Sequence, residues 1–79
     1  MQVILNRALK PIKNGWSAQA ATVGIAAHGF SADIADRNLA YAVRLFLQPF
    51  ERNGVLEQEG AAMRIELIGE GDIEVVLRD

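Results

Sequence analysis

The chain has 79 residues, of which 51% are apolar and 23% charged, a composition typical of one folded domain rather than of a disordered segment. Its length excludes two full domains, so we predict a single domain over residues 1–79. A chain of this size buries only about 60% of the surface that it exposes when unfolded, and we expect homo-oligomerisation to supplement its core. There is no cysteine and only one histidine, which excludes disulfides, thiolate nucleophiles and the usual zinc sites.

The charge balance argues against dedicated binding to nucleic acid, because the net charge is −2. No stretch approaches the roughly 20 apolar residues of a membrane span, and the first residues do not resemble a secretory signal, so we expect a cytoplasmic protein. The distribution of charge is uneven. Residues 1–56 carry six basic and three acidic side chains, whereas residues 57–79 carry two basic and seven acidic ones. The C-terminal part therefore predicts an acidic face that meets a basic partner.

Three strands are predicted before the first helix. Residues 3–9 form the first, an edge strand, because Pro11 lacks the amide that continuous pairing needs. Asn14-Gly15 is a two-residue reversal signal that joins it to a second strand over residues 16–23, which is rich in alanine and could accept a closely packed helix. Residues 25–28 form a short third strand that Gly29 closes.

The clearest periodicity belongs to one amphipathic helix. Ser31 is a suitable N-cap, and Asp33 lies favourably in the first turn. We expect Pro49 to kink or end the helix near Leu47 or Gln48, because an interior proline costs about 3 kcal/mol. The residues that fall on the expected buried side are Ala35, Leu39, Ala42, Val43, Phe46 and Phe50.

Two further strands are predicted in residues 63–67 and 73–78, where apolar and charged residues alternate. Pairing Leu67 with Ile73 keeps the apolar side chains on one face of a hairpin whose loop is residues 69–71. This register places Glu66 opposite Glu74, an unfavourable like-charge pair that hints at a cationic partner. We therefore predict a partner-binding surface on this hairpin, made by Glu66, Glu70, Asp72 and Glu74.

No catalytic, metal-binding or cofactor-binding constellation is apparent, and we predict that the chain is not an enzyme. His28 is best explained as a structural residue near a turn, and Ser31 as a helix cap. The glycines around Glu70 join two strands, whereas a phosphate-binding loop leads from a strand into a helix.

A pattern in which small residues dominate runs from the predicted second strand into the predicted helix. It consists of Gly15, Trp16, Ala18, Gly24, Gly29, Ser31, Ala35, Asn38 and Ala42. This pattern resembles the N-terminal domain of the HicB antitoxin family. The resemblance implies a reduced ribonuclease-H-like fold of three strands, a helix and a further strand. The predicted elements themselves give an α+β fold of order β-β-β-α-β-β, with one amphipathic helix on one face of an antiparallel sheet. It also implies the family's role, which is to bind a small basic RNA-cleaving toxin, HicA. The family's C-terminal DNA-binding module finds no counterpart in these residues, so we expect no direct DNA binding.

Our leading interpretation is a non-catalytic module that masks a HicA-like toxin by complementary charge. An alternative is a HicB-like domain that self-associates without a toxin, with a dimer surface of Leu45, Leu47 and edge strands. A third is an RNA-binding or catalytic protein, which would show RNA binding that depends steeply on salt and is lost with Arg37 and Arg44.

Overall fold

The computed structural model describes all 79 residues, which form six strands and two helices. The elements in chain order are β1 (Gln2–Asn6), β2 (Ala8–Ile12), β3 (Gly15–Ala20), β4 (Ile25–Gly29), α1 (Ala32–Arg52), α2 (Leu56–Ala62), β5 (Glu66–Ile68) and β6 (Glu74–Arg78). The fold is α+β, as predicted, but its order is β-β-β-β-α-α-β-β. The molecule is elongated, with extents of 40 × 18 × 17 Å.

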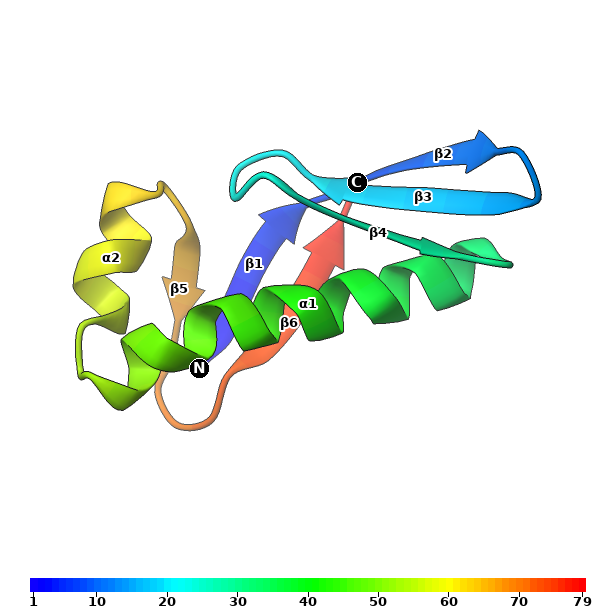
Figure 1. Cartoon of the computed structure of the whole chain (residues 1–79). Helices are drawn as coiled ribbons and strands as arrows, with labels where there is room; N and C mark the ends of the chain where they lie inside the picture. The colour runs from blue at the N-terminus through cyan, green and yellow to red at the C-terminus, as the bar shows by residue number, and fades with distance from the viewer.

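The strands form two three-stranded sheets (Figure 1). One, which we call the hairpin sheet, has the order β2-β3-β4 and is antiparallel throughout. The other, which we call the terminal sheet, has the order β5-β1-β6, with β1 antiparallel to β5 and parallel to β6. Helix α1, about 31 Å long at 1.5 Å per residue, packs against both sheets through β3, β4 and β6.

The predicted first strand is two strands, because the chain leaves one sheet and enters the other at Arg7. Of these two strands, β2 is the one at an edge, and it carries Pro11 where the proline's missing amide is tolerated. The prediction of an edge position was wrong for β1, which is the central strand of the terminal sheet. The reversal into β3 is confirmed, with Asn14 at a φ of 66° and Ile12 paired with Gly15.

Helix α1 begins as predicted, because the Ser31 hydroxyl oxygen accepts a hydrogen bond from the amide of Ile34 at 3.2 Å. Its N-terminal half lies close to β4 because Gly29 has no side chain there. A Cβ atom at Gly29 would lie only 2.5 Å from the backbone nitrogen of Ala35. Glycine thus gives the close approach between helix and sheet that the alanine-rich strand β3 also favours.

Of the two outcomes expected near Leu47 or Gln48, a kink or an end of the helix, the end was wrong, since α1 continues through Pro49 to Arg52. The tertiary contacts of the last turns outweigh the local cost of the proline. Leu47 is fully buried in the core, and the rings of Phe46 and Phe50 meet edge to face at 5.6 Å across the proline. The burial of Leu47 also rules out its predicted place on a dimer surface, whereas Leu45 is 47% exposed.

Helix α2 has no counterpart in the prediction. No side chain caps the N-terminal amides of α2, and the helix contains Gly60, which disfavours helix formation. The local sequence signals for a helix are therefore weak. Gly60 is buried because α2 packs on β5: a Cβ atom there would lie 2.8 Å from Leu67 Cδ1. The core joins both sheets and both helices, and its members are Val3, Leu5, Ala18, Ala20, Ala35, Leu39, Val43, Leu47, Leu56, Ile65 and Ile73.

The predicted C-terminal hairpin was also wrong. The two strands exist, but β1 lies between them, so Leu67 pairs with Val3 and not with Ile73. Val3 pairs with Val75 on its other side. A buried N-terminal strand with two buried aliphatic side chains, Val3 and Leu5, is a better partner for each C-terminal strand than the other C-terminal strand is.

Candidate partner-binding surface

The terminal sheet has an inner face that packs on α1 and an outer face. Because Val3 and Leu5 are buried in the core, the alternate residues of β1 face outward. The pairing register extends this assignment to the neighbouring strands. The outward residues are Gln2, Ile4 and Asn6 on β1, Glu66 and Ile68 on β5, and Glu74, Val76 and Arg78 on β6.

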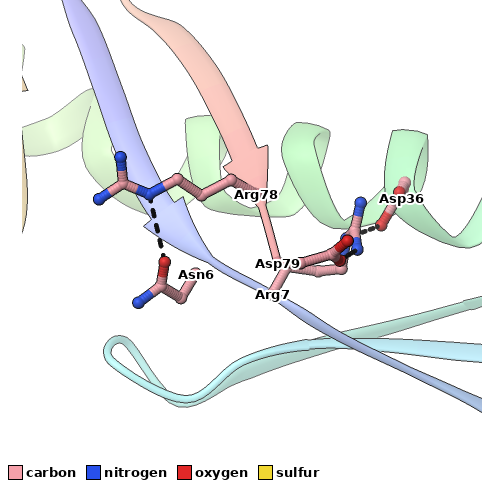
Figure 2. Close-up of polar contacts among 5 residues, drawn as sticks. All are labelled: Asn6, Arg7, Asp36, Arg78 and Asp79. Carbon is pink, nitrogen blue, oxygen red and sulfur yellow. Dashed lines mark hydrogen bonds and ion pairs between the residues drawn. The ribbon is translucent and has the colours of Figure 1, made fainter.

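Glu66, the first predicted site residue, is paired with a cation of its own chain. Arg78 reaches across β1, and its Nη2 donates to Glu66 Oε2 at 3.1 Å. The Nε of Arg78 also donates to Asn6 Oδ1 at 3.3 Å (Figure 2). Both charged side chains are about half exposed, at 57% and 49%. Part of the charge of Glu66 is therefore neutralised before any partner arrives.

Glu70 and Asp72 lie in the loop between β5 and β6, in which Gly69 and Gly71 have φ values of 81° and 93°. The loop folds around the N-terminus, whose amine donates to the carbonyl oxygens of Glu70 at 2.6 Å and Asp72 at 2.8 Å. These contacts use the backbone, so the two carboxylates stay exposed and form no ion pair. The loop thus presents two unpaired negative charges on a tethered backbone.

Glu74 starts β6 and is also exposed and free of ion pairs. It borders a groove of about 250 Å³ between β6 and α1, together with Tyr41 and Arg44. Glu74 does not lie opposite Glu66 as predicted: Glu66 pairs with Ile4 and Glu74 with Gln2, on opposite sides of β1. The two strands are roughly 10 Å apart, so the predicted like-charge repulsion is absent and gives no hint of a partner.

Two further carboxylates lie at the same end of the molecule as the β5–β6 loop. Glu51 and Glu57 line a hollow of about 350 Å³ with Met1 and Gly71. We call Glu51, Glu57, Glu70 and Asp72 the acidic end. The sequence had placed Glu51 in the basic half of the chain, and only the length of α1 brings it here. Lys13 lies at the turn between β2 and β3, toward the far end of the long axis (Figure 1).

A second charged cluster holds the two sheets to the helix (Figure 2). The side chain of Arg7 is only 13% exposed, and its Nε lies 2.7 Å from Asp36 Oδ1. Its Nη1 contacts the carboxylate of Asp79, and its backbone amide donates to the carbonyl of Arg78 at 2.7 Å. Asp36, which lies near the start of α1, is thus a partner of Arg7.

No catalytic arrangement is formed by the serine and histidine side chains. Ser17 is buried opposite the exposed His28 on the same face of the hairpin sheet, but no side-chain hydrogen bond joins the two, and Ser31 caps α1. No group of three or more histidine or carboxylate side chains is arranged to hold a metal ion. Neither helix combines the length and the apolar character that crossing a membrane requires.

Comparison of the chain with protein-family models, with curated proteins and with solved structures finds no match.

Proposed function

We propose that this chain is a non-catalytic interaction module, a HicB-like antitoxin that binds and masks a small basic RNA-cleaving toxin. The observation that carries the proposal is the set of exposed, unpaired carboxylates at one end of an elongated molecule, with Glu70 and Asp72 on a tethered loop. A negative surface of this kind attracts a positive RNA-binding surface and competes with RNA for it.

The element order adds support. If β1 and β2 are counted as one strand interrupted at Arg7, the chain runs through three strands, a helix and a final strand, with α2 and β5 added. The final strand, β6, is parallel to β1. This is the order expected from the resemblance to the HicB family. Among the predicted contact residues, Glu70, Asp72 and Glu74 contribute most, because Glu66 is already paired with Arg78.

The test first asks whether a small basic protein is encoded beside this chain, and then measures whether that protein cleaves RNA. We expect the chain to suppress cleavage at low salt and to lose part of its affinity at higher salt. The double variant Glu70→Gln and Asp72→Asn removes two negative charges and should weaken the complex about tenfold or more. The matched control, Ala8→Lys with Thr22→Lys, changes the net charge equally at exposed positions outside the acidic end.

A neighbouring protein that does not cleave RNA, or whose cleavage is unaffected by the chain, would overturn the proposal. Equal weakening by the test and control variants would show that net charge, and not this surface, governs binding.

A second candidate, the self-associating HicB-like domain, is favoured by one observation, the exposed Leu45 on α1. The two functions are compatible, because Leu45 is not among the residues of the acidic end.

A further inference from the structure

The four outer strands of the two sheets differ in how their free edges are protected. Exposed edges usually carry charges or prolines, which prevent pairing with another chain. Strand β2 has Lys10 and Pro11, β5 has Glu66, and β6 has Glu74 and Arg78 at its ends. Strand β4 reads Ile-Ala-Ala-His-Gly, with no lysine, arginine, carboxylate or proline. It is the one edge without such protection.

A hydrogen bond shows which backbone groups of β4 point to its free edge. The Asn38 side chain donates from Nδ2 to the carbonyl oxygen of His28 at 2.8 Å. That carbonyl is therefore directed away from β3, toward the helix side of the free edge. Since alternate residues of a strand direct their backbone groups alike, the N–H and C=O of Ala26 also point outward. Asn38 occupies the edge at His28 and leaves it open at Ala26.

The side of α1 that borders this edge is uncharged. At about 100° per residue, Ile34, Ala42, Leu45 and Phe46 fall within a quarter turn of Asn38. The same arc also contains the buried Ala35 and the residues Tyr41, Gln48, Pro49 and Arg52. We call the five together the neutral strip: Ile34, Asn38, Ala42, Leu45 and Phe46. Three of its members are large and exposed, namely Ile34 at 38%, Leu45 at 47% and Phe46 at 37%. The charged residues before Arg52 fall on the other side, from which Asp36 reaches Arg7.

We propose that the β4 edge and the neutral strip together bind a second copy of this chain, in a two-fold dimer in which the β4 strands pair antiparallel about Ala26. Each Ala26 N–H donates to the Ala26 carbonyl of the other copy, so the two free groups satisfy one another. The hairpin sheets then join into one six-stranded sheet, and the two α1 helices lie side by side on its inner face.

The spacing along strand and helix supports this register. Gly29 packs against Ala35, and Ala26 lies three residues, or about 10 Å, from Gly29 along the strand. That distance corresponds to about seven helical residues, which places the two-fold axis near Ala42. A small residue at the axis lets the helices approach, and Leu45 of each copy then packs beside Asn38 of the other.

The chemistry of the surface favours a second copy over the basic partner proposed above. A toxin with a basic surface would find no counter-charge on the β4 edge or the neutral strip. A two-fold dimer instead places an uncharged surface against the same surface of the other copy. It also pairs the Ala26 N–H of each copy with the Ala26 carbonyl of the other. The acidic end stays accessible in this dimer, so the inference adds an oligomeric arrangement to the proposed function and does not depend on it.

The experiment measures the molar mass of the full chain by sedimentation equilibrium over a range of concentrations. We expect a dimer, at twice the 8.6 kDa of one chain, whose stability changes little with salt. Leu45→Glu should weaken the dimer about tenfold or more, because it places a charge in the apolar contact. The matched control is Arg44→Glu, which introduces the same residue on the charged side of α1 and should leave the dimer intact.

A second variant tests the strand pairing. Ala26→Pro removes the outward N–H, which does not pair with β3, and should give a folded monomer whose circular dichroism matches that of the wild type. In the wild type, the Ala26 amide should exchange with solvent more slowly as the protein concentration rises.

A wild-type chain that remains monomeric at millimolar concentration, or a dimer that survives both Leu45→Glu and Ala26→Pro, would overturn the proposal. Binding of the basic toxin is measured separately on the monomeric variants. Toxin binding that survives the acidic-end variant overturns the proposed function alone, and a dimer that survives both Leu45→Glu and Ala26→Pro overturns the proposed dimer alone.

Discussion

The two sheets of this protein are built in different ways. The hairpin sheet is formed by three consecutive strands joined by short turns, and the helix that covers it follows directly. The terminal sheet brings together the first strand and the last two, so that Gln2 is paired with both Ile68 and Glu74. One sheet therefore depends on neighbours in the sequence, and the other on the two ends of the chain.

This difference separates local from non-local stability. Contacts that close a long loop come at a higher entropic cost, so strands that pair across the whole chain tend to form late in folding. Helix α1 contacts both sheets. Its N-terminal half packs on the hairpin sheet, and its C-terminal half extends over the terminal sheet (Figure 1). The hairpin sheet with the start of α1 is thus the natural early structure, and the terminal sheet completes the core.

The largest expected effect comes from the centre of the terminal sheet. Leu5 on β1 is 2% exposed, and Leu5→Ala should lower the free energy of unfolding by about 2–5 kcal/mol. If the terminal sheet forms late, most of this loss appears as faster unfolding in stopped-flow measurements with urea. The matched variant Leu39→Ala, in the helix half over the hairpin sheet, should instead slow refolding. If Leu5→Ala and Leu39→Ala divided their effects between the folding and unfolding rates in the same way, the two sheets would not differ in the order in which they fold.

The cluster of Arg7 tests how firmly the two sheets are held together. Arg7→Met keeps most of the apolar stem but leaves Asp36 without its cation. A fully buried pair broken in this way costs about 3–5 kcal/mol, and the partial exposure of Asp36 reduces this to about 2–3 kcal/mol. Urea denaturation checks the value. Asp33→Asn, on the same helix but without an ion pair, should change stability by only about 0.5 kcal/mol.

The same contrast explains what could be predicted from the sequence. The turn at Asn14, strand β4 and the Ser31 cap depend on neighbouring residues, and the structure has each of them close to its expected place. The pairing of β5 and β6 with β1 depends on residues about 60 to 70 positions apart, for which no local signal exists. Alternation correctly identified β6 but overlapped β5 only at Glu66 and Leu67, and the adjacency of the two strands in the sequence suggested a hairpin.

The candidate surface follows the same pattern. Glu70 and Asp72 were found from charge alone, because a loop between two strands is exposed wherever the strands pair. The contribution of Glu51 depends on a helix that continues through Pro49, and the pairing of Glu66 with Arg78 depends on β1 lying between two strands. Neither could be foreseen without knowing the non-local pairing.

The smallest expected effect on stability concerns this last contact, which reports on the surface of the terminal sheet. Arg78 and Glu66 are both about half exposed, so Arg78→Gln should change the free energy of unfolding by less than about 1 kcal/mol. It frees the carboxylate of Glu66 and removes a positive charge, so the proposed basic toxin should bind more tightly and with a steeper salt dependence. Arg64→Gln removes the same charge from an exposed residue that forms no ion pair, and it should have a smaller effect on binding. If both variants tighten binding equally in titration calorimetry, the outer face of β5 and β6 lies outside the toxin interface, and the loop with Glu70 and Asp72 alone makes the contact.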